Sequence, residues 1–143
     1  MATLTSSNSV LMIGIANLYN VPVQIQGYAT DDAFTTEEVD TAETMMGVDG
    51  KLSAGFTPYP VTLDINLQAD SASNLFFDAW IAAEAVAREK YIANATILLP
   101  GTSFLYAFTR GFMTKASVMP ANKKILQPRK FTIVFQNISR APV

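Results

Sequence analysis

The sequence predicts an α+β fold, mainly β, in which two antiparallel sheets pack together as a sandwich or barrel-like unit beside one α-helix. Two segments, Val61–Ala69 and Lys130–Ile138, alternate apolar and polar residues with the period of a strand. A third, Asn74–Tyr91, repeats its apolar residues with the period of a helix. The chain has 143 residues, the length of one ordinary domain, so we expect a single domain over residues 1–143.

The first fifty residues predict one strand between two less regular segments. Residues 1–20 are interpreted as an N-terminal arm, since most of the first nine residues are small or polar. Val21–Tyr28 alternates as a strand does, and Pro22 is acceptable near its start. Residues 30–50 are acidic and poorly periodic, so they predict an extended loop. Loops of this length are uncommon unless they have a function.

The middle of the chain predicts a strand followed by the helix. Val61–Ala69 has the clearest alternation in the sequence. The next four residues, Asp70–Ser73, can cap the helix predicted over 74–91. Its apolar stripe is interpreted as core packing against a sheet, and consists of Phe76, Trp80, Ala83 and Ala87.

The remaining segments complete about six strands, with the helix inserted after the third or fourth. Ile92–Leu99 is rich in apolar residues and precedes a turn. Thr102–Phe112 is rich in aromatic residues and has a continuous apolar core, as in a strand covered on both faces. Met119–Pro128 predicts a loop before the last strand.

The composition excludes most enzyme classes. The chain has no cysteine and no histidine, so it has no disulfide, thiolate nucleophile, Cys/His zinc site or Ser-His-Asp triad. Its paired carboxylates fall in the acidic loop, whereas catalytic pairs need rigid, partly buried carboxylates. We expect no enzymatic activity, cofactor or metal. The apolar run Val10–Ala16 is too short to cross a bilayer, and the features together suggest a soluble protein made in a reducing cytoplasm.

Charge is divided unevenly along the chain. Residues 1–50 carry −7 and residues 51–143 carry +5, which gives the net charge of −2. Three interpretations are open: a solvated loop with a scattered basic surface, a nucleic-acid site in the basic half, or head-to-tail contact between copies. The basic residues of the second interpretation are Lys115, Lys123, Lys124, Arg129 and Lys130.

From about Ile15 to Val143, the chain resembles the tail tube proteins of long-tailed bacteriophages, in particular those with contractile tails. The resemblance lies in the order and spacing of segments, because none of them is a chemical motif. These segments are Val21–Phe34, Gly47–Phe56 (preceded by Thr44-Met45-Met46), Leu67–Trp80, Thr109–Lys115 and Leu126–Phe135.

The resemblance implies the tail-tube fold and a structural virion protein. In that family six subunits form a ring, inner strands join into a continuous barrel, and rings stack into a tube through which the genome is ejected. The implied partners are further copies of the chain, a sheath protein outside, and tape measure protein and then DNA in the lumen. The implied location is the phage tail, assembled in the host cytoplasm. A nucleic-acid-binding or packaging-associated module is the alternative.

The resemblance also predicts where rings meet, because tubes of this family use extended loops to contact the adjacent ring. We expect the acidic loop to face a basic surface of the next ring. The acidic candidates are Asp31, Asp32, Glu37, Glu38, Asp40 and Glu43, and the basic candidates are Lys123, Lys124, Arg129 and Lys130.

Overall fold

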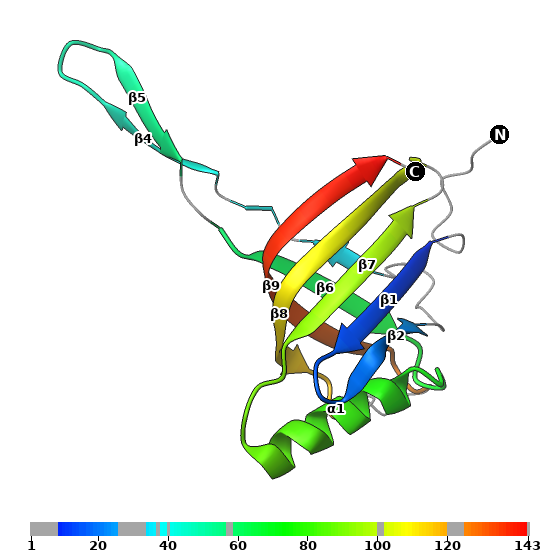
Figure 1. Cartoon of the computed structure of the whole chain (residues 1–143). Coiled ribbons are helices and arrows are strands. Elements are labelled where there is room, and N and C mark those ends of the chain that lie inside the picture. Colours follow the sequence, from blue (N-terminus) through cyan, green and yellow to red (C-terminus); the bar gives the residue numbers. More distant parts are fainter. Residues whose placement is uncertain are drawn as a thin grey trace.

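The computed structural model describes residues 9–25, 34–36, 38–39, 41–56, 59–99, 102–119 and 125–142. Within these ranges the chain forms nine strands and one helix (Figure 1). In chain order they are β1 (Val10–Ile15), β2 (Tyr19–Ile25), β3 (Phe34–Thr36), β4 (Ala42–Met46), β5 (Leu52–Phe56), β6 (Val61–Leu67), α1 (Asn74–Ala87), β7 (Ala93–Leu99), β8 (Phe104–Ala116) and β9 (Arg129–Pro142).

Seven strands form one curved antiparallel sheet in the order β2-β1-β7-β8-β9-β6-β3. The two longest strands, β8 and β9, hold its two halves together, because β9 pairs with β8 along most of its length and with β6 over Arg129–Phe135. The order begins at β2 and ends at β3, so this sheet is open among the described residues. Helix α1 lies beneath one end of it (Figure 1).

The second sheet is the β4–β5 hairpin, which projects away from the body (Figure 1). Its register runs from Ala42 opposite Phe56 to Met46 opposite Leu52. Gly50 has a φ of +84° in the connecting turn, a conformation that glycine adopts without steric cost. The predicted class, mainly β with one helix and two antiparallel sheets, is confirmed. The two sheets are unequal: one forms the body and the other is an arm.

The core lies between the sheet and α1. Alternate residues of β1, β6 and β9 point into it, and in β6 and β9 this gives the sequence its period of two. From α1, Phe77 and Trp80 are fully buried, and the ring of Phe77 stacks on that of Phe131 at 4.2 Å between centroids. Each such side chain stabilises the fold by about 1.5–3 kcal/mol relative to an exposed one.

Helix α1 begins where it was predicted and ends four residues earlier. The side-chain amide of Asn74 donates to the carbonyls of Gln68 and Ala69 at 2.9 and 3.1 Å, which fixes the helix start against the end of β6. At the other end Arg88 takes a left-handed conformation, with φ of 56°, and its N–H donates to the Glu84 carbonyl. This terminates the helix.

The predicted helix stripe is correct only in its first half. Phe76 and Trp80 are buried, but Ala83 is half-buried and Ala87 is exposed. The buried face instead includes Phe77, which the prediction missed. The last helical turn lies away from the sheet, so its alanine has nothing to pack against (Figure 1).

Two predictions for the first fifty residues need correction. The predicted N-terminal arm, 1–20, contains β1 and the start of β2; residues 1–8 lie outside the described residues. The predicted loop, 30–50, contains β3 and β4. The described residues thus form nine strands rather than about six, with α1 after the sixth. No described helix is long and apolar enough to span a membrane.

Gly111 gives a test of this packing. A Cβ added there would overlap the ring of buried Phe135 on the neighbouring strand. We expect Gly111→Val to lower the free energy of unfolding by about 1–3 kcal/mol, the usual cost of overpacking a core. The measurement is urea denaturation. Gly55→Val is the control, because a Cβ there meets nothing within 4 Å and should change stability little.

Candidate functional site

Six of the ten residues predicted to join rings lie outside the described residues: Asp31, Asp32, Glu37, Asp40, Lys123 and Lys124. The other four divide into two groups. Glu38, Glu43 and Lys130 are exposed, as a contact surface requires. Arg129 is buried, with a relative exposure of 4%.

Arg129 belongs to an internal ion pair. Its Nη1 and Nη2 donate to the two carboxylate oxygens of Asp78 on α1, at 3.1 and 2.7 Å. Its Nε and Nη2 also donate to the Ser117 carbonyl, at 3.1 and 2.8 Å, and its guanidinium lies 5.0 Å from the centroid of the Phe131 ring. The prediction that it belongs to an exposed basic surface is therefore wrong. For the same reason Arg129 is not free to bind nucleic-acid phosphates.

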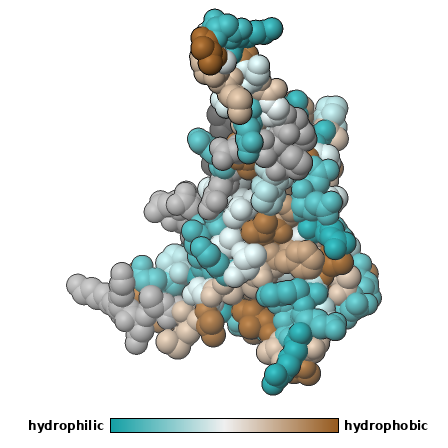
Figure 2. All heavy atoms as spheres, turned by 90° about the vertical axis from the view of Figure 1, so that its left-hand side faces the viewer, coloured by the Kyte–Doolittle hydropathy of each residue, from teal (hydrophilic) through white to brown (hydrophobic). Residues whose placement is uncertain are grey.

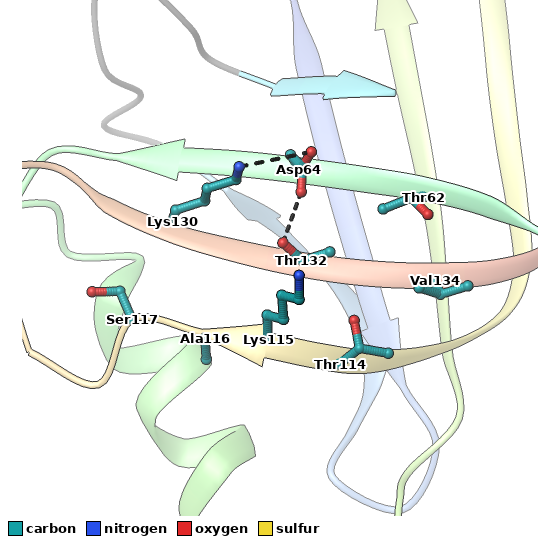
Figure 3. A pocket seen from close by; sticks show the side chains of 9 residues that line it. All are labelled: Thr62, Asp64, Thr114, Lys115, Ala116, Ser117, Lys130, Thr132 and Val134. Atoms are coloured by element: carbon teal, nitrogen blue, oxygen red, sulfur yellow. Dashed lines mark hydrogen bonds and ion pairs between the residues drawn. The ribbon is translucent and has the colours of Figure 1, made fainter. Parts of the chain in front are cut away.

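Lys130 lies at the edge of a polar pocket on the outer face of β6, β9 and β8 (Figure 3). The buried carboxylate of Asp64 accepts a hydrogen bond from the Thr132 hydroxyl at 2.7 Å, and lies 4.0 Å from the Lys130 ammonium. Lys115 extends from β8 on the same face (Figure 3). The pocket has a volume of about 420 Å³ and is lined by Thr62, Asp64, Thr114, Lys115, Ala116, Ser117, Lys130, Thr132 and Val134.

This pocket is suited to an acidic group. Its two ammonium groups and one carboxylate leave a net charge of +1, and the hydroxyls of Thr62 and Thr114 can donate hydrogen bonds, whereas that of Thr132 already donates to Asp64. Of the four basic residues predicted to join rings, only Lys130 is both described and exposed, and Lys115 lines the same pocket. The sequence predicts Lys115 only for the nucleic-acid alternative.

The projecting hairpin has one face without charge. The β4–β5 register places on this side Ala42, Thr44, Met46, Leu52 and Ala54, which we call the hairpin face. Met46 and Leu52 are 63% and 59% exposed, and Val48 in the turn is fully exposed. The opposite side carries Glu43 and Met45. Hydrophobic side chains are visible at the outer end of the hairpin, at the top of Figure 2.

A second group of exposed apolar residues lies at the other end of the molecule, beside α1 (Figure 1). We call it the α1-side surface; it consists of Leu75, Val118, Met119, Ile125 and Leu126. Arg129 brings two of these residues near each other, because its Nη2 lies 3.4 Å from the Val118 carbonyl oxygen and 2.7 Å from Asp78, which is one helical turn after Leu75. Sequence reasoning missed both apolar surfaces, although Met45, Met46 and Val48 stand out in a segment otherwise rich in acids.

Comparison with known protein families shows which family the chain belongs to. The model of the family described as tail fiber protein gp32 matches residues 2–139. The chain belongs to this family. Membership confirms the predicted resemblance to a phage tail-type protein. No curated protein matches the chain.

Solved structures share the fold of this gp32-family chain. A chain of the anti-feeding prophage tube terminating cap has a TM-score of 0.60 and 11% identity, over 100% of this chain and 93% of that one. One of the anti-feeding prophage baseplate has a TM-score of 0.57 and 14% identity, over 100% and 99%. One of an extracellular contractile injection system, in the PVC sheath-tube complex, has a TM-score of 0.59 and 10% identity, over 93% and 88%. At such identities the likeness is one of fold.

Proposed function

We propose that the chain is a structural component of a phage-like tail that assembles with further copies of itself and has no enzymatic activity. The observation that carries this proposal is the pair of exposed apolar surfaces at opposite ends of the subunit. Soluble domains rarely leave such surfaces bare unless a partner covers them. Membership of the tail fiber protein gp32 family supports it, as does a fold found in a contractile sheath-tube complex.

More specifically, we propose that the subunits form a hexameric ring, and that these rings stack into a tube inside a sheath. Contact between different surfaces of identical subunits generates rings or helical filaments. Neighbouring subunits would also cover the open sheet edges at β2 and β3, which otherwise invite uncontrolled pairing. The similar baseplate chain comes from a six-fold symmetrised particle, which supports the number six.

We also propose that the tube conducts DNA, after a tape measure protein has left its lumen. One row of side chains across the outer face of the sheet is uncharged, namely Met12, Thr96, Ala107 and Ser139. The next row, Val10, Leu98, Leu105 and Ala141, is also uncharged. A lumen lined by such residues would not hold phosphates, since protein affinity for nucleic acid comes largely from lysine and arginine.

Electron microscopy of the purified protein tests the proposal. We expect rings or tubes by negative stain, and masses above the 15.5 kDa monomer in light scattering as the protein concentration rises. Monomers alone, at every salt and protein concentration, would contradict self-assembly. We further expect no retardation of DNA in a gel at low salt. Binding that weakens steeply with salt would instead favour the nucleic-acid alternative.

A further inference from the structure

We propose that the hairpin face of one subunit binds the α1-side surface of a second copy, with Met46, Leu52 and Val48 as its apolar centre. This inference rests on the self-assembly proposed above, and adds the two surfaces that meet. It also changes the expected character of the contact. The contact predicted from sequence is between acids and bases, whereas the contact proposed here is between an uncharged surface and an apolar one.

The hairpin cannot cover this face by itself. An isolated two-stranded sheet is marginally stable in water, and gains stability when one face packs against another element. Every described side chain from Thr41 to Gly55 is exposed, so the body of the same subunit does not cover it. A covering surface must come from another molecule.

The occupant is a second copy because the subunit carries a complementary surface that its own hairpin cannot contact. The hairpin and α1 project from opposite ends of the body (Figure 1). At the α1 end, Leu75, Val118 and Met119 are 73%, 79% and 72% exposed. Two apolar surfaces at opposite ends would bury each other when subunits join head to tail, which is favourable in proportion to the apolar area removed from water.

Charge beside the two surfaces is complementary as well. The polar pocket with Lys115 and Lys130 is also lined by Ser117, which directly precedes Val118 of the α1-side surface. The hairpin carries Glu43 on its other side and Asp49 in its turn, against the single base Lys51. These charges set the orientation of the contact more than its strength.

Adjacent methionines give a matched pair of variants. Met46 lies on the hairpin face, and Met45 lies on the opposite side with similar exposure. We expect Met46→Glu to raise the concentration needed for assembly about tenfold or more, because a carboxylate would be buried among apolar groups. Met45→Glu should change it by less than about threefold. Val118→Glu on the receiving surface should match Met46→Glu, and thermal unfolding of the monomers shows whether all three variants fold alike.

Cross-linking tests the contact directly, because the chain contains no cysteine. A Val48→Cys variant is mixed with a Val118→Cys variant and treated with a short bis-maleimide. We expect a cross-linked dimer from the mixture, and markedly less from either variant alone. Met46→Glu introduced into the Val48→Cys chain should remove it.

The outcomes separate this inference from the proposed function. If the unmodified chain assembles, but Met46→Glu and Val118→Glu assemble equally well and the mixture gives no cross-link, the inference is wrong and self-assembly stands. If the unmodified chain stays monomeric, self-assembly itself fails. A hairpin that cross-links to a different protein in purified particles, and not to Val118→Cys, also overturns the inference.

Discussion

Replacing Phe77 by alanine is expected to lower the free energy of unfolding by about 3–5 kcal/mol, the range for a buried aromatic residue cut back to alanine. Phe77 has no exposed surface, and its ring stacks on Phe131 of β9 at an interplanar angle of 10°. It also packs against Trp80, one turn along the helix. Its loss would leave a cavity at the point where α1 meets the sheet.

Urea denaturation at a protein concentration where the chain is monomeric measures this loss. Trp80 is the only tryptophan and is fully buried in the same cluster, so its fluorescence reports the unfolding of this region. Leu75→Ala is the control on the same helix, because a residue 73% exposed should change stability by no more than about 0.5 kcal/mol. Equal effects of the two variants would mean that α1 is not held by the Phe77 stack.

Helix α1 and strands β6 and β9 are predictable from sequence because burial in them follows a period. Val61–Leu67 and Phe131–Phe135 place every second side chain in the core. The first strand escaped prediction because its outward residues, Val10 and Met12, are as apolar as its buried ones. The hairpin strand β4 escaped for the opposite reason. All five of its residues are exposed, so no alternation marks it as a strand.

The early end of α1 has no comparable signal. Arg88 takes the left-handed conformation that glycine or asparagine usually supplies at a helix end. Glu84 helps to fix this end. Its carboxylate accepts hydrogen bonds from the Trp80 indole, the Lys90 ammonium and the Tyr91 amide, at 3.0, 2.9 and 3.0 Å. These contacts turn the chain from the helix into β7 and depend on the assembled fold.

In the candidate site, too, some features follow from the local sequence pattern and others depend on tertiary contacts. Arg129 and Lys130 are neighbours and looked equivalent as bases, yet one is buried and the other exposed. Strand alternation explains this, because extending the buried set Phe131, Ile133 and Phe135 backward by two residues reaches Arg129. That pattern could have placed Arg129 inside. Its partner Asp78 lies 51 residues away in sequence, and only the fold brings them together.

Asp78→Ala is expected to cost about 3 kcal/mol, the lower end for breaking a buried ion pair by removing one partner. The reason is that it leaves the buried Arg129 guanidinium without its carboxylate. We place the cost at the lower end because the Asp78 side chain is 46% exposed and two backbone carbonyls still accept from Arg129. Urea denaturation of the monomer measures it, and Asp78→Asn should cost less, since its amide oxygen still accepts one of the two hydrogen bonds.

A double-mutant cycle with Arg129→Met completes this prediction. Once the buried guanidinium is gone, Asp78→Ala no longer leaves a buried charge without its partner. Its further cost in the free energy of unfolding should therefore fall below about 1 kcal/mol. If it costs as much as in the unmodified chain, the pair does not carry the effect.

Arg129→Met also removes the donors that hold the Ser117 and Val118 carbonyls. It should therefore weaken assembly beyond its effect on folding, whereas Gly111→Val, which destabilises the core away from the α1-side surface, should leave the assembly of its folded molecules unchanged.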